Sequence, residues 1–179
     1  FGLKAPSALT KSFFENFSFA KVTHACHRRA SNWSWAKLPG DDFVIIGGYE
    51  SGMDAASNLA SYGKRCTVVS STAYWNVATE DPSTELAPYT AGRVRAACNT
   101  LTPPRLLAPL RVYAVEPLEE GDAGGYLVRA RWGAPAEDKS VPYRAQLPSA
   151  SDAASADDKP TEGTEISLRT PQAPVLCAG

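Results

Sequence analysis

The stretch that decides the fold reads Asp41-Asp42-Phe43-Val44-Ile45-Ile46-Gly47-Gly48-Tyr49-Glu50-Ser51-Gly52-Met53-Asp54-Ala55-Ala56. It begins with a short, continuously apolar run, which is typical of a parallel strand that is buried on both faces. Glycines and then small residues follow at once, as in the tight turn and helix that open a nucleotide-binding βαβ unit. The stretch therefore predicts such a unit, with its ligand at the turn.

The turn departs from the dinucleotide fingerprint at one position. In the fingerprint the first glycine permits the turn, the second lets the backbone approach the pyrophosphate, and the third lets the helix pack on the strand. Gly47 and Gly52 supply the first and third, but Tyr49 stands at the second. Glu50 adds a negative charge beside a helix N-terminus that otherwise attracts anions, or else it only stabilises the helix dipole. Cofactor binding and a retained fold with an empty site both remain open.

A helix and a second buried strand are predicted after the turn. The apolar residues at helical spacing are Met53, Ala56, Leu59 and Ala60. Ser51 and Asp54 are expected to form a capping box, and Gly63 is expected to end the helix in the left-handed conformation. The strand is predicted at Cys66–Ser70, which completes a strand–helix–strand unit.

The rest of the chain predicts one more helix and an antiparallel sheet. The helix is expected from about Pro88 to Asn99, with Pro88 in its first turn. Three alternating segments follow, at about Leu110–Val115, Tyr126–Trp132 and Glu165–Arg169. A last buried strand is expected within residues 173–179. The predicted class is α/β, with a Rossmann-like parallel sheet, helices and a three-stranded antiparallel meander.

Composition shifts predict four regions along the chain. They are an aromatic-rich N-terminal arm at 1–40, the first part of the Rossmann-like domain at 41–133, a low-complexity insertion at 134–163, and the final strands of the same domain at 164–179. The insertion is dominated by Ala, Ser, Asp, Pro and Lys, which cannot build a core. The arm carries Phe and Trp side chains, and these need a surface to cover them.

Length, charge and cysteines limit the classes of function. The 179 residues are 44% hydrophobic and carry a net charge of −1, which suits one core and gives no electrostatic footprint for nucleic acid. No run approaches the roughly 18 apolar residues of a membrane span. The chain begins at Phe1 without Met or a signal pattern, so we expect a processed subunit or part of a longer protein.

The four cysteines favour reduced thiols. Cys26, Cys66, Cys98 and Cys177 show no short pairing, and Cys66 and Cys177 sit in apolar strand-like runs. This usage is compatible with a reducing compartment, either the cytoplasm or an organelle such as a chloroplast or mitochondrion.

Several motifs together resemble a known family. They are His24, Trp35, Gly47–Ala56, Asp81-Pro82-Ser83, Leu86, Pro88-Tyr89-Thr90 and Arg93. This pattern is similar to the NAD(P)H-binding domain of two-dinucleotide-domain flavoproteins, in particular flavin-dependent monooxygenase-like oxidoreductases. The resemblance covers about residues 20–117 and 164–179, and it includes Tyr49-Glu50. It implies an NADPH-binding domain that delivers hydride to FAD bound by a missing or partner domain, because only one fingerprint turn is present.

The resemblance also implies cofactor-binding residues. The turn residues Gly47, Gly48, Tyr49, Glu50, Ser51 and Gly52 would meet the pyrophosphate. Ser70, Ser71 and Thr72, at the end of the second strand, would meet the adenosine ribose. No acidic residue stands there, which favours NADPH over NADH. Arg93 could reach the site from the next helix, or it could be an ordinary surface charge.

Other kinds of chemistry find little support. His24-Ala25-Cys26-His27 offers too few ligands for zinc, and Cys26 lacks the second cysteine that dithiol reduction requires. Ser83 has histidines only in the N-terminal arm, so a catalytic triad is not expected. No catalytic residue is assigned. The alternative is a non-catalytic Rossmann-like scaffold subunit of a larger, organellar complex, held to other subunits through the aromatic arm.

Overall fold

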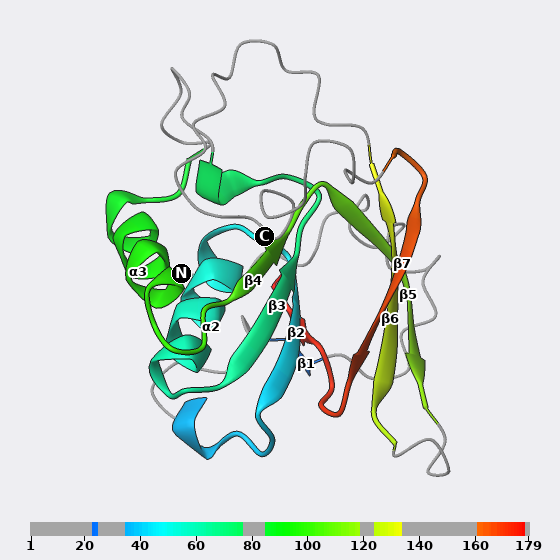
Figure 1. The fold of residues 1–179 in the computed structure, drawn as a ribbon, viewed down its shortest axis with the longest axis horizontal. Helices are drawn as coiled ribbons and strands as arrows, with labels where there is room; N and C mark the ends of the chain where they lie inside the picture. The colour runs from blue at the N-terminus through cyan, green and yellow to red at the C-terminus, as the bar shows by residue number, and fades with distance from the viewer. Residues whose placement is uncertain (1–22, 25–34, 77–84, 119–123, 134–160, 178–179) are drawn as a thin grey trace, which may run out of the picture.

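The computed structural model describes residues 23–24, 35–76, 85–118, 124–133 and 161–177. Within them, Figure 1 shows three layers, with two helices on one side, a parallel sheet in the middle and an antiparallel sheet on the other side. This arrangement confirms the predicted α/β class with a Rossmann-like sheet and a meander.

The central layer is a five-stranded parallel sheet with the order β1-β8-β2-β3-β4. Its strands are β1 (Thr23–His24), β2 (Asp42–Ile46), β3 (Arg65–Val69), β4 (Arg105–Leu107) and β8 (Val175–Leu176). Ile46 pairs with Val69 on one side and with Leu176 on the other, so the strands end together at one edge of the sheet. The chain changes direction in the sheet between β2 and β8, which is where open α/β sheets bind ligands.

Helix α2 (Glu50–Ser61) crosses from β2 to β3 and buries its apolar face, as predicted. Gly63 after it has a φ of 71°, which confirms the expected left-handed residue. The predicted capping box of Ser51 and Asp54 is wrong. The helix starts earlier, at Glu50, and its cap residue is the extended Tyr49, which makes no side-chain cap hydrogen bond.

Helix α3 (Pro88–Cys98) confirms the second predicted helix and packs against α2. Both helices cover the same face of the parallel sheet (Figure 1). The core between them and the sheet contains Phe43, Ile45, Met53, Leu59, Val68, Val94 and Leu106, among others. Two short 3-10 helices adjoin this layer, η3 (Trp35–Lys37) before β2 and η4 (Tyr74–Asn76) after β3.

The predicted meander is confirmed as an antiparallel sheet with the order β5-β6-β7. Its strands are β5 (Leu110–Pro117), β6 (Tyr126–Trp132) and β7 (Glu165–Thr170). Side chains alternate between the faces of a strand, so Val44 of β2 points to the meander while its neighbours Phe43 and Ile45 point to the helices. The second core formed there contains Val44, Val69, Leu107, Leu110, Val112, Val115, Val128 and Ala130.

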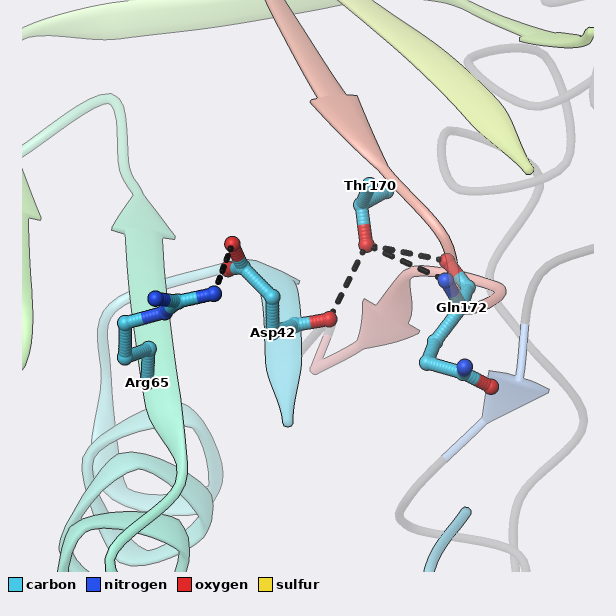
Figure 2. A network of polar contacts seen from close by, with 4 residues as sticks. All are labelled: Asp42, Arg65, Thr170 and Gln172. Atoms are coloured by element: carbon cyan, nitrogen blue, oxygen red, sulfur yellow. Dashed lines mark hydrogen bonds and ion pairs between the residues drawn. The ribbon is translucent and has the colours of Figure 1, made fainter. Parts of the chain in front are cut away.

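A polar contact joins the end of the meander to the start of β2 (Figure 2). The hydroxyl of Thr170 lies 3.3 Å from the carbonyl oxygen of Asp42 and 3.2 Å from that of Gln172. It also accepts a hydrogen bond from the Gln172 N–H at 3.3 Å. Because Thr170 is only 2% exposed, these contacts satisfy a buried hydroxyl and fix the path from β7 to β8.

A buried lysine lies at the end of the parallel sheet where β2 and β3 begin. The ammonium group of Lys64 donates to the carbonyl oxygens of Leu38 at 2.8 Å and Gly40 at 2.7 Å. It also lies 3.7 Å from the carboxylate of Asp41 and 5.6 Å from the ring centre of Phe43. These contacts hold the segment between η3 and β2 against the end of α2.

The structure adds two strands that were not predicted, β1 and β4. β1 lies within the predicted aromatic-rich arm, where no strand was expected. The phenylalanines of that arm and most of the predicted insertion at 134–163 lie outside the described residues. None of the helices in the described part of the chain is both long enough and apolar enough to cross a bilayer.

Candidate functional site

The turn between β2 and α2 has the backbone geometry that its glycines predicted. Gly47 has a φ of 106°, which L side chains rarely adopt, and its N–H donates to the Val69 carbonyl at 2.9 Å. A Cβ at Gly47 would collide with the Cys177 carbonyl oxygen, next to β8. A Cβ at Gly52 would collide with the carbonyl oxygen of Gly47. The first and third fingerprint glycines therefore serve the tight turn and the close packing of helix on strand.

Gly48 has a different use in this turn. A Cβ at Gly48 would lie 2.6 Å from Cβ of Ser70 and 2.9 Å from the indole of Trp75. Both of those residues are buried, at 4% and 6% exposure. The missing side chain thus allows the segment that follows β3 to pack directly on the turn.

Tyr49 replaces the middle glycine without covering the turn with its ring. The ring packs at a tilt against Tyr74 of η4, with 5.0 Å between the ring centres. Its hydroxyl donates to the carbonyl oxygen of Glu85 at 3.1 Å. The side chain therefore extends from the turn toward η4 and the segment before α3, while its backbone remains the extended cap of α2.

Glu50 places its carboxylate at the start of helix α3. One carboxylate oxygen accepts a hydrogen bond from the N–H of Ala87 at 2.5 Å, and the other accepts one from the hydroxyl of Thr90 at 2.5 Å. Ala87 is the cap residue of α3 and has no side chain that could satisfy the first N–H groups. Glu50 satisfies the N–H of Ala87 itself and brings a favourable charge to the dipole of α3.

Two more residues on the same face of α2 contact α3. Asp54, one turn after Glu50, pairs with the guanidinium of Arg93 at 2.5 Å, and Asn58 accepts a hydrogen bond from it at 2.9 Å. We call these residues, Glu50, Asp54 and Asn58 on α2 with Thr90 and Arg93 on α3, the polar seam. The seam was not predicted. Its only signal in the sequence is the spacing of four residues on α2.

The structure places Arg93 in the polar seam, which it shares with the predicted site residue Glu50. The turn residues Gly47 to Gly52 lie at the edge of the sheet where the strands end, and Ser70 packs directly against Gly48. The hydroxyl of Ser70 donates to the Thr72 carbonyl at 2.7 Å, while Ser71 is exposed. Arg93 lies in the polar seam, where Asp54 and Asn58 engage its guanidinium.

The N-terminus of α2 is the feature with clear binding capacity. The first N–H groups of a helix have no partner within the helix, and its dipole attracts an anion there. Tyr49, the cap of α2, makes no side-chain cap hydrogen bond to them. Phosphate oxygens are suitable acceptors for these groups, so the turn can hold a phosphorylated ligand.

No disulfide joins the described cysteines, and Cys66 and Cys177 are buried in the strand-like runs where the sequence placed them. Burial raises the pKa of the Cys66 thiol to about 12, with smaller contributions from Asp42 and Cys98. Burial also raises the pKa of Cys98. Cys66 is therefore a protonated thiol at neutral pH and a weak nucleophile. Cys26, His27 and Ser83 lie outside the described residues, as does the side chain of His24.

A comparison with protein-family models finds a match for this chain. Residues 13–121, more than half of the chain, match the family model described as pyridine nucleotide-disulphide oxidoreductase. The matched range contains the glycine turn, both helices and the first four parallel strands in chain order. The chain belongs to the pyridine nucleotide-disulphide oxidoreductase family.

Proposed function

We propose that the chain is the NADPH-binding domain of a flavin-dependent, monooxygenase-like oxidoreductase, which presents the cofactor to FAD bound elsewhere. NADPH supplies a hydride when it is bound, and the residues of this chain bind and orient it. One observation carries the proposal. The cap residue Tyr49 makes no side-chain cap hydrogen bond to α2, and the turn before this helix is built on Gly47 and Gly52 and lies where the parallel strands end.

The pyrophosphate would lie against the first turn of α2. There the backbone N–H groups of Glu50, Ser51 and Gly52 would donate to its oxygens. Two side chains that could oppose binding are engaged elsewhere, because Tyr49 contacts Tyr74 and Glu85 and Glu50 contacts α3. The residues at this turn therefore fit the cofactor even though the middle glycine is missing.

The adenosine ribose would lie against residues 70–72. Val69-Ser70-Ser71-Thr72 contains no carboxylate that would repel a 2′-phosphate, which supports NADPH as the cofactor. The Ser70 hydroxyl already donates to the Thr72 carbonyl, so Ser71 and Thr72 offer the hydroxyl groups with fewer internal contacts. A role for Arg93 at the 2′-phosphate would require it to leave Asp54 and Asn58.

Calorimetric titration with NADPH and NADH tests this proposal. The informative variant is Ser51→Asp, because a carboxylate at this exposed position favours the helix dipole but repels pyrophosphate. We expect it to weaken NADPH binding by about tenfold with no loss of thermal stability. Ser167→Asp, on the exposed face of β7, is the matched control and should leave binding unchanged. Absence of binding to the wild-type chain at millimolar NADPH would contradict the proposal.

A non-catalytic scaffold subunit is the second candidate function. It is favoured by the structural use of Tyr49 and Glu50, since their contacts with residues 85–90 explain both without a cofactor. The same titration separates the two candidates. A folded wild-type chain that binds neither NADPH nor NADH would favour the scaffold.

A further inference from the structure

Glu50 raises a problem for anion binding at its own helix. It is the first residue of α2, so its backbone N–H belongs to the group that would face a pyrophosphate. Its carboxylate is attached to the same residue and would itself be attracted to that helix N-terminus if it were free. A free Glu50 side chain would therefore compete with a phosphate for the turn.

Two groups of α3 prevent this competition. The Ala87 N–H and the Thr90 hydroxyl hold one carboxylate oxygen each. Thr90 is only 4% exposed, so its hydroxyl has little access to water and depends on this acceptor. The neighbouring Tyr49 fixes the same segment through its hydrogen bond to Glu85. Both carboxylate oxygens thus have partners that are 37 and 40 residues away in sequence.

We propose that Thr90 is a positioning residue for the pyrophosphate turn. Its hydroxyl keeps the negative charge of Glu50 at the N-terminus of α3 and leaves the N-terminus of α2 available to the phosphates of a dinucleotide. This inference rests on the proposed function, because it concerns how tightly the same turn binds NADPH. Thr90 acts through Glu50 and does not touch the cofactor.

The test measures NADPH affinity by calorimetry for the full chain and its variants. Thr90→Val keeps the shape of the side chain but removes the hydroxyl, and we expect binding to weaken by about fivefold to tenfold. Thr90→Ser should bind as the wild type does. The decisive variant is Thr90→Val combined with Glu50→Gln, which removes the released charge and should restore affinity to within about twofold of the wild type.

Asn58→Ala is the matched control from the polar seam. It removes a contact between α2 and α3 that lies further along α2 than Asp54 and away from the glycine turn. The variant should therefore lower stability without changing NADPH affinity. A melting curve for each variant separates the two effects. A purely structural role for Thr90 would weaken binding in Thr90→Val with no rescue by Glu50→Gln.

Each outcome has a distinct meaning. If the wild-type chain does not bind NADPH, the proposed function itself fails. If it binds, unchanged affinity in Thr90→Val, or weakened affinity without rescue, overturns the positioning role. If Thr90→Val does not fold, Thr90→Ala takes its place, alone and combined with Glu50→Gln. We expect the same loss of NADPH affinity in the single variant and the same recovery in the double variant, and a loss without recovery would again overturn the positioning role.

Discussion

The two helices of the parallel-sheet layer begin in different ways. Neither cap residue, Tyr49 for α2 or Ala87 for α3, makes a side-chain cap hydrogen bond. Helix α3 nevertheless receives the carboxylate of Glu50 at its first turn. Helix α2 begins at the glycine turn, beside the edge where the parallel strands end. The chain thus supplies a carboxylate to the N-terminus of α3 internally, and we propose that the N-terminus of α2 receives its negative charge from a ligand.

This difference explains the two residues that depart from the fingerprint. Tyr49 and Glu50 stand at the turn of α2, but their side chains serve the segment before α3 and its first turn. A side chain at the middle fingerprint position need not obstruct the pyrophosphate when a neighbouring element holds it. The predictions that follow test this division between the two helix starts.

The largest effect is expected at Gly52. Gly52→Ala places a Cβ against the Gly47 carbonyl oxygen, which forces α2 away from β2 and should lower the free energy of unfolding by about 3 kcal/mol. Gly92→Ala, on the exposed face of α3, meets no atom within 4 Å and should raise it by about 0.5–1 kcal/mol. Urea unfolding of both variants measures the contrast. Similar stabilities would contradict the close packing of the start of α2 against the glycine turn.

A smaller effect is expected when Glu50 is removed. Glu50→Ala leaves the Ala87 N–H and the buried Thr90 hydroxyl without their acceptor, at a cost of about 2 kcal/mol in the free energy of unfolding. Glu50→Gln keeps an acceptor oxygen and should cost less than about 1 kcal/mol. Urea unfolding again gives the values. An Ala variant as stable as the Gln variant would show that Glu50 does not cap α3.

The smallest effect is expected further along the polar seam. Asp54→Asn weakens the pair with Arg93, whose side chain is 29% exposed, and should cost about 0.5–1 kcal/mol of unfolding free energy. Asp42→Asn is the control, because its partner Arg65 is 70% exposed and lies 3.5 Å away. We expect almost no change there. Equal losses of unfolding free energy in the two variants would show that the polar seam contributes no more stability than an exposed ion pair.

Much of the fold could be predicted because its signals are local. The apolar run before Gly47, the helical spacing of the residues around Leu59 and the alternation in the meander each lie within a single element. Strand β4 was missed because its three residues, Arg105–Leu107, are too few to show a period. β1 was missed for the same reason, since it has two residues and depends on pairing with β8.

The candidate site was predicted only in part. The turn glycines could be predicted, because a backbone position that needs a positive φ or a close approach is usually filled by glycine, and glycine is visible in the sequence. The partners of Glu50 and Arg93 lie between 35 and 40 residues away, so their contacts depend on how α3 packs on α2. The capping box failed for a related reason. The turn sets the first residue of α2, and Ser51 already lies inside the helix.

The most direct test follows the backbone amides of the chain during a titration with NADPH by nitrogen–proton correlation NMR. We predict that the amide signals of residues 47–52 shift in proportion to bound cofactor, while those of residues 89–91, in the first turn of α3, stay in place. The carboxylate of Glu50 lies at that second helix start, so we expect no phosphate to bind there. Unchanged signals at residues 47–52, or larger shifts at residues 89–91, would contradict the account.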